Sequence, residues 1–145
     1  MRAEARRQRR ELYLAHGCAQ LDGKGTFSWT PDRDRLGALH GTIAGRSARL
    51  AVDPGLGSSL ISRRFATELG IAGGPPIDVR GPTGPVTGAP ATVELQIGGA
   101  RARDVAVAVV DALPEDLDGV IGLDFLWRFE ITDDRGRLRA APPRR

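Results

Sequence analysis

Asp53 is the residue of this sequence whose setting best suits chemistry. It follows the apolar segment Leu50-Ala51-Val52 and precedes Pro54-Gly55, so an expected strand ends at a carboxylate and a turn. A carboxyl group held in this way can exchange a proton and activate water, which is acid–base chemistry. Asp-Pro-Gly alone is also a common turn sequence, so the chemistry depends on what accompanies it. The accompanying feature is Val120-Ile121-Gly122, which is typical of a short buried strand.

Other catalytic motifs are incomplete. A phosphate-binding P-loop needs a glycine-rich loop that ends in lysine, and the only lysine, Lys24, lies in a different context. Gly55-Leu56-Gly57 begins like a dinucleotide fingerprint, but Leu60 stands where the third glycine belongs. A serine hydrolase elbow needs Gly-x-Ser-x-Gly, and the second glycine is missing after Ser58 and Ser59. The sequence therefore disfavours these three classes of enzyme.

Potential metal ligands are too few and too scattered to form a site. His16, Cys18 and His40 do not have the spacing of tetrahedral zinc ligands. Residues 116–119 carry two carboxylates and a glycine, but a calcium loop needs further oxygen ligands and a closing glutamate. We therefore expect no metal and no cofactor, and a turn at 116–119.

The elements that position Asp53 are expected to be mostly β-strands. The chain has 19 glycines and 10 prolines, which favour many turns over long helices. Residues 39–43 and 47–52 are expected to form a hairpin around a turn at 44–46, and this hairpin leads into Asp53. Further strands are expected at 26–29, 91–97, 105–110 and 119–122, with a last hairpin turn at 134–136.

Two kinds of segment interrupt this strand pattern. Ser62 is a suitable N-cap for a helix that runs through Leu69 and stops at Gly70, and residues 123–129 suit one or two helical turns. Residues 81–88 contain too much glycine and proline for a regular element and lie between two strand-like stretches. This composition predicts a mobile hairpin or loop.

The order of these features resembles the retropepsin-like aspartic proteases, a single-lobed family. In that family an apolar strand ends in Asp-Thr/Ser-Gly, and residues 53–62 resemble that segment with Asp-Pro-Gly in its place. Residues 120–126 resemble the family's second mark, two apolar residues and a glycine before a short helix. Thr83-Gly84-Pro85-Val86 lies where the family has its flap. The resemblance covers about Leu39 to Leu138 and implies a mainly β fold, a retropepsin-like barrel with one or two short helices.

The resemblance implies an aspartic endopeptidase with Asp53 as its catalytic residue. The catalytic loop would include Pro54, Gly55 and Ser58, and Val120-Ile121-Gly122 would support it. This chemistry needs two carboxylates close together, because like charges a few Å apart cannot both ionise and one holds a proton while the other activates water. The chain has one such Asp, so a second copy must supply the other. We therefore expect a homodimer that holds a polypeptide substrate beneath two flaps.

Three departures from the family pattern bear on activity. Pro54 has neither the hydroxyl nor the N–H with which the family's Thr or Ser joins the two loops across the dimer. Gly57 replaces a hydroxyl residue that bonds the Asp carboxylate, for which Ser58 could substitute, and Leu56 replaces a small residue. Each lost buried hydrogen bond costs about 1 kcal/mol. Two functions stay open: a weak endopeptidase, and a catalytically degenerate domain that binds a peptide or dimerises.

Length and charge indicate the domain organisation. A chain of 145 residues fits one domain, and we expect a basic arm and turn-rich lead-in over 1–36, a retropepsin-like domain over 37–140 and a basic tail over 141–145. Five of the first ten residues are arginine, in an arm (1–20) that is either helical or disordered. Because this arm lacks interleaved aromatic residues, nucleic acid is an unfavoured partner.

The sequence also bears on location. It has no run of about 18 apolar residues and no apolar segment behind its N-terminal charges, so we expect no membrane segment and no export signal. Cys18 is the only cysteine, which excludes an intrachain disulfide. The cytoplasm is therefore the expected compartment.

Overall fold

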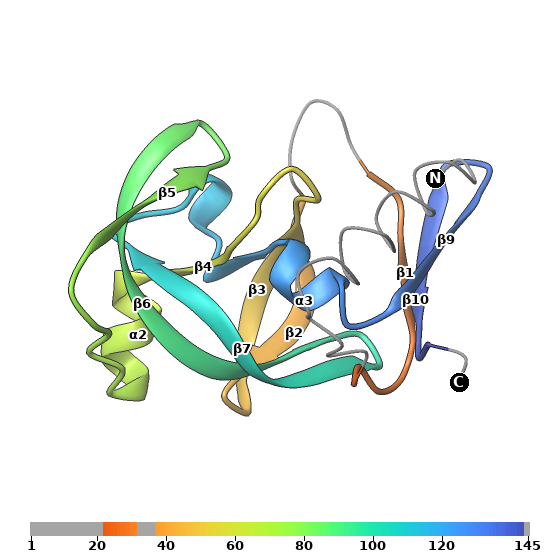
Figure 1. Cartoon of the computed structure of the whole chain (residues 1–145), viewed down its shortest axis with the longest axis horizontal. Helices are drawn as coiled ribbons and strands as arrows, with labels where there is room; N and C mark the ends of the chain where they lie inside the picture. Colours follow the sequence, from red (N-terminus) through yellow and green to blue (C-terminus); the bar gives the residue numbers. More distant parts are fainter. Residues whose placement is uncertain (1–21, 32–36, 144–145) are drawn as a thin grey trace.

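The computed structural model describes residues 22–31 and 37–143, and these form a mainly β structure (Figure 1). The elements are β1 (Phe27–Trp29), β2 (Leu39–Ile43), β3 (Arg46–Val52), β4 (Ser59–Ser62), α2 (Arg63–Leu69), β5 (Ile77–Gly81), β6 (Gly84–Ile97), β7 (Ala100–Val110), the 3-10 turn η1 (Pro114–Asp116), β8 (Gly119–Ile121), α3 (Leu123–Leu126), β9 (Glu130–Asp134) and β10 (Arg137–Ala141). The predicted mainly β fold with short helices is confirmed. The predictions for residues 1–20 lie outside the described residues.

Six strands close into a barrel in the order β2-β3-β8-β4-β7-β6, because β2 pairs with β6 as well as with β3. Four of the six barrel pairings are antiparallel, whereas β4 and β7 run parallel and so do β3 and β8, with Val52 opposite Ile121. The two chain segments that follow these strands therefore leave the sheet side by side. This pairing places Asp53 at the same edge as Gly122.

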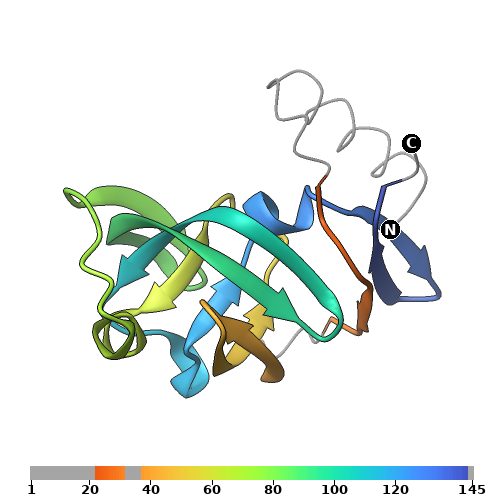
Figure 2. The ribbon, with the colours of Figure 1, turned by 90° about the horizontal axis from the view of Figure 1, so that it is seen from below.

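A second, three-stranded sheet has the order β1-β10-β9. Figures 1 and 2 show this small sheet at one end of the molecule and the β5–β6 hairpin at the other. Phe27 and Trp29 of β1 are buried and stack with ring centroids 4.7 Å apart. The segment before Gly37 therefore contributes a strand and aromatic core residues to the fold.

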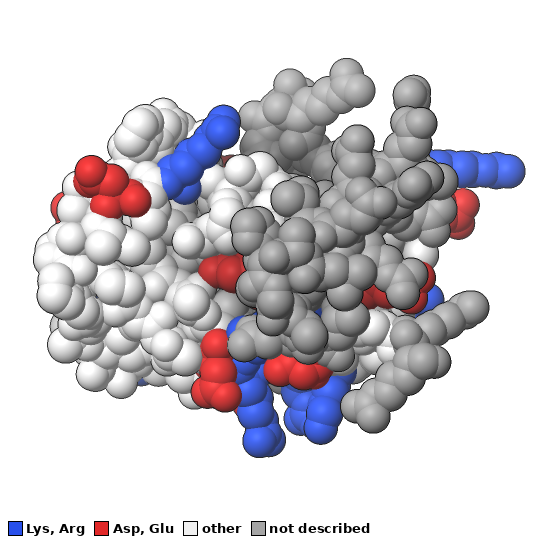
Figure 3. All heavy atoms as spheres, viewed as in Figure 1, with Lys and Arg blue, Asp and Glu red and all other residues white. Residues whose placement is uncertain are grey.

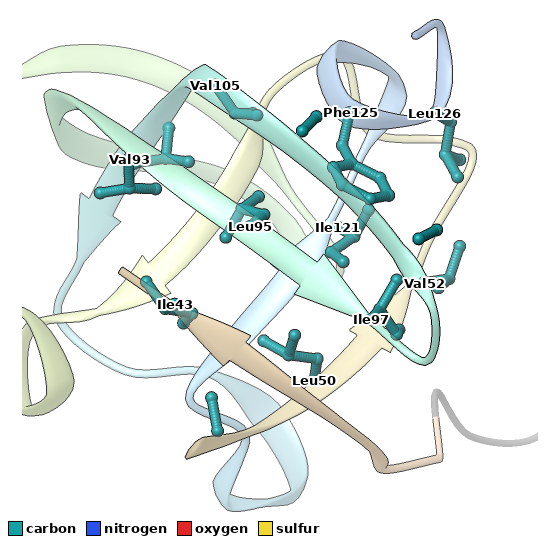
Figure 4. Close-up of a cluster of buried hydrophobic side chains, with 14 of the residues drawn as sticks. Ile43, Leu50, Val52, Val93, Leu95, Ile97, Val105, Ile121, Phe125 and Leu126 are labelled. Carbon is teal, nitrogen blue, oxygen red and sulfur yellow. The ribbon is translucent and has the colours of Figure 1, made fainter. Parts of the chain in front are cut away.

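The central strands are apolar on both faces, as predicted for 105–110. Strand alternation sends Leu50, Val52 and Ile121 into the large core inside the barrel, part of which Figure 4 shows. The residues between them point to the opposite face and form a smaller group that we call the second cluster: Ala51, Leu56, Leu60, Ala108, Val110, Leu117 and Val120. The sheet that carries Asp53 is thus covered on both sides.

Local sequence signals account for most element ends. The Ser62 hydroxyl accepts a hydrogen bond from the Phe65 amide at 3.3 Å, and Gly70 ends α2 in the left-handed conformation (φ 74°), so both predicted caps are confirmed. The second helix, α3, is shorter than the predicted 123–129. The helices of the described residues are too short and too polar to cross a lipid bilayer.

Candidate active site

The Asp53 loop begins where β3 ends. The Asp53 amide donates to the Ile121 carbonyl at 2.9 Å, and the Asp53 carbonyl accepts from the Leu56 amide at 3.1 Å. This second bond closes a β-turn in which Pro54 and Gly55 are the central residues. Proline suits the first central position, because its φ is already correct and its missing N–H is not needed there. The loop therefore forms with Pro54 in place.

The same turn orients the Asp53 carboxylate. Its Oδ1 accepts a hydrogen bond from the Gly55 amide at 2.9 Å, and the side chain is partly exposed. An aspartate that accepts from the amide two residues ahead forms a compact local turn. One carboxylate oxygen is thus fixed by the backbone at the exposed edge of the sheet.

Backbone hydrogen bonds hold the Asp53 loop against the segment that follows β8. The Leu123 amide donates to the Leu56 carbonyl at 2.8 Å, and the Asp124 amide donates to the Gly57 carbonyl at 3.2 Å. Gly122 lies so close that an added Cβ would be 2.7 Å from the Leu56 carbonyl oxygen. Only glycine fits this position, because the opposing group is backbone and cannot turn away. The structure thus brings the predicted catalytic loop and the predicted supporting segment together.

A buried pair of side chains reinforces this junction. The Ser59 hydroxyl donates to Asp124 Oδ1 at 2.5 Å and accepts from the Gly122 amide at 2.9 Å, while the Ser59 amide lies 3.0 and 2.9 Å from the two Asp124 oxygens. Burial raises the pKa of Asp124 above 3.8, although its hydrogen bonds with Ser59 and the charge of Arg128 oppose the rise. Asp124 thus links the Asp53 loop to the segment that follows β8.

Sequence reasoning missed this pair. It singled out Ser58, which makes no hydrogen bond to Asp53 among the described residues, and the hydroxyl that joins the two loops belongs to Ser59. The available signal was the position of Ser59 directly before the apolar residues of β4. A hydroxyl buried there needs a partner, and Asp124 follows two residues after Gly122.

The predicted flap residues lie in the β5–β6 hairpin. Thr83 is in the two-residue turn between Gly81 and Gly84, and Pro85 and Val86 are in β6. The expectation that 81–88 is too rich in glycine and proline for a regular element is wrong. Between Gly84 and Gly88, β6 pairs with β5 alone and has a free edge on its other side, so glycine and proline cost little pairing there. A hollow of about 550 Å³ lies on this hairpin beside Asp78, Val79, Arg80, Gly84 and Pro85.

The paired loops carry a second carboxylate besides that of Asp53. It belongs to Asp124, which is buried and accepts a hydrogen bond from the Ser59 hydroxyl. No three His, Cys, Asp or Glu side chains of the described residues gather to hold a metal ion. On the part of the face in Figure 3 that the described residues cover, acidic and basic side chains both occur along the lower edge. This distribution is unlike the continuous basic stripe that binds nucleic acid.

Comparisons with known proteins agree with this geometry. A family model described as aspartyl protease matches residues 39–125, which span both loops and the β5–β6 hairpin. No curated protein matches the sequence.

Two solved structures are similar to this chain. A retropepsin-like aspartic protease from Rickettsia conorii superposes with a TM-score of 0.57 and 19% identity, over 80% of this chain and 90% of that one. The retroviral protease-like domain of Ddi1 from Leishmania major has a TM-score of 0.42 and 19% identity, over 70% of this chain and 81% of that one. The likeness to the Rickettsia conorii protein shows a retropepsin-like fold. Because the family model matches more than half of this chain, the chain belongs to the aspartyl protease family.

Proposed function

We propose that this chain is an aspartic endopeptidase that works as a homodimer, in which each copy contributes Asp53 to one shared site. The observation that carries the proposal is the Asp53 loop itself, with one carboxylate oxygen fixed by the Gly55 amide and the loop braced on Gly122. Because each chain has one Asp53 loop, a second copy must supply the other carboxylate of the site. Polypeptide is the proposed substrate, held between the paired Asp53 loops and the β5–β6 hairpins.

The proposed chemistry follows from the shared charge of two aspartates. When two carboxyl groups lie a few Å apart, one proton is shared between them, as is established for aspartic protease dyads in general. The ionised carboxylate takes a proton from water, and the resulting hydroxide attacks the peptide carbonyl carbon. The protonated carboxyl group donates its proton to the carbonyl oxygen. The carboxyl group that took the proton from water then donates it to the nitrogen, and the C–N bond breaks. The other carboxylate takes back the hydroxyl proton of the tetrahedral intermediate, which restores the shared proton of the pair.

Pro54 favours a second candidate, a catalytically degenerate domain that binds a peptide or dimerises. Its ring removes the backbone N–H at the position that follows the catalytic Asp, and it carries no hydroxyl. The turn forms without these groups within one chain. Their absence would weaken the contact between two copies, because hydrogen bonds between the two Asp53 loops would lose a donor from each loop.

The deciding experiment is cleavage of a peptide library from acidic to neutral pH by the wild type and by Asp53→Asn and Pro54→Thr variants. The proposal expects cleavage by the wild type, and a loss of at least about a hundredfold in Asp53→Asn, the scale of an acid–base contribution. Cleavage by Pro54→Thr alone would favour the degenerate domain. A protein that sediments only as a monomer at high concentration would overturn the dimeric site.

A further inference from the structure

We infer that Leu56 is a specificity-determining residue, whose side chain occupies an apolar space between the Asp53 loop and the β5–β6 hairpin that a substrate side chain would otherwise enter. Peptides with small residues at the cleaved bond would then fit best. This inference rests on the proposed function, since it concerns the substrate of the same site.

Leu56 is coupled to Asp53 by the turn. Its amide donates to the Asp53 carbonyl at 3.1 Å, and its carbonyl accepts from Leu123 at 2.8 Å, so its backbone is fixed on both sides. Its side chain is only 1% exposed and belongs to the second cluster. This leucine, three residues after Asp53, therefore points its side chain into an apolar wall and not into solvent.

The wall around Leu56 has room for a large side chain because some of its other members are small. Ala51 of β3 and Ala108 of β7 belong to the same cluster and are buried. Close packing leaves few voids in a protein interior, so one large side chain beside small neighbours occupies space that a small residue would leave open. With leucine at position 56, that space is filled by the chain itself.

The β5–β6 hairpin covers this wall. Val79 and Val86 are register partners in the hairpin and pack against the second cluster. The part of the hairpin from Ile77 to Gly88 pairs only with itself, since β6 first pairs with β7 at Ala89. The hairpin can therefore move away from the wall without breaking the barrel. A polypeptide that enters between them lays a side chain against Leu56.

The test compares two peptides that differ only at the two residues flanking the cleaved bond, Ala-Ala or Leu-Leu. Values of kcat/KM are measured for the wild type, Leu56→Ala, Leu56→Val and Leu50→Val. Leu50 is the matched control, because it is a buried leucine of the same sheet that points into the large core. Thermal melts establish that each variant is folded, and Leu56→Val keeps the test open if Leu56→Ala does not fold.

We expect the wild type to prefer Ala-Ala, and Leu56→Ala to lower that preference at least about tenfold, the scale of a change in pocket size. Leu56→Val should lower it less, and Leu50→Val should leave it unchanged. An unchanged preference in the folded Leu56 variants overturns the inference while the peptidase stands. If no variant cleaves either peptide, the proposed function fails instead. In that case, the binding affinities of the wild type and Leu56→Ala for the two peptides test the inference. If both proteins show the same ratio of affinities for Ala-Ala and Leu-Leu, the inference is rejected.

Discussion

At the scale of single residues, a buried carboxylate other than that of Asp53 links the two loops of the site. Asp124 is buried and accepts hydrogen bonds from the amide and hydroxyl of Ser59, which in turn accepts from the Gly122 amide. A partner lost from such a buried network leaves polar groups unsatisfied, which costs more than the bond itself contributes. Ser59 and Asp124 therefore stabilise the loop geometry on which Asp53 depends.

The raised pKa of Asp124 gives a stability prediction with a definite sign. Because the native state binds this proton more tightly than the unfolded chain, the contribution of Asp124 to stability increases as pH falls through its native pKa and levels off below 3.8. Asp124→Asn, which is neutral and keeps an acceptor for Ser59, should be more stable than the wild type at neutral pH, and the difference should shrink on acidification. Urea unfolding at several pH values measures this.

Ser59→Ala is the companion variant. It leaves the Gly122 amide and a buried Asp124 oxygen without the hydroxyl, so we expect a loss of about 1–3 kcal/mol in the free energy of unfolding. Ser58→Ala is the matched control and should change stability little. If Asp124→Asn were less stable than wild type by the same amount at every pH, charge burial would not be the cause.

Pro54 should stabilise the turn that it occupies. The bond between the Leu56 amide and the Asp53 carbonyl shows a turn whose first central residue is proline. Pro54→Ala adds conformational freedom to the unfolded chain, so we expect a loss of about 0.5–1 kcal/mol in the free energy of unfolding. Pro142→Ala, which follows the last strand, is the control for urea unfolding. A gain in stability in Pro54→Ala would indicate strain at this turn.

At the scale of elements, sequence patterns located the strands where alternation is regular. The hairpin of β2 and β3, the turn between β6 and β7 at Gly98 and Gly99, and the turn between β9 and β10 were all predictable, because each turn contains glycine between apolar segments. Strand β7 begins at Ala100, before the predicted Val105, because Arg101 and Arg103 mask a pattern whose buried members are alanines. The first residues of β7 are in a strand because they pair with β6, which the sequence pattern does not reveal.

The site could be predicted only in part, for a related reason. Asp53 and Gly122 were recognisable because each follows an apolar run. The bonds that link Ser59 to Asp124 cross 65 residues of sequence, and no local pattern encodes them. They arise because β4, which begins at Ser59, pairs with β8, which leads into Gly122 and Asp124.

The β5–β6 hairpin should be the least protected part of the described sheet. Residues 77–88 pair only within the hairpin, whereas β7 has a partner on each side. Local opening is easier where few strands and contacts hold an element, so we expect amides of β5 to exchange with deuterium at least about tenfold faster than those of β7. Hydrogen exchange followed by mass spectrometry or NMR measures both in one sample.

Val86→Thr tests the anchor of this hairpin, because it keeps the shape but removes an apolar contact with the second cluster. It should speed exchange in β5 and leave β7 unchanged. Thr92→Val, at an exposed position of β6 beyond the hairpin, is the matched control. Equal protection of β5 and β7 in the wild type would show that the hairpin opens only with the whole barrel.

At the scale of the whole molecule, Arg128 ties three segments together. Its side chain is 4% exposed, donates to the carbonyls of Arg103 and Asp104 in β7, and lies 3.5 Å from the Asp22 carboxylate. The Gly23 amide donates to its carbonyl at 3.0 Å. This buried cation joins the segment before β1 to the barrel through charge-assisted bonds. Strand β7 and the segment before β1 are thus both fixed to the residues that follow α3.

The proposed site requires two copies, which gives a quantitative prediction for mixed dimers. When wild type and Asp53→Asn are mixed in equal amounts and allowed to exchange, random pairing leaves about one quarter of the dimers with two aspartates. Activity per total protein should therefore fall to about one quarter of that of the wild type alone. Chains that each carried a complete site would retain one half, because every wild-type chain would stay active. A mixture with Arg135→Gln, altered at an exposed turn far along the chain from Asp53, should keep full activity and thus controls for mixing itself.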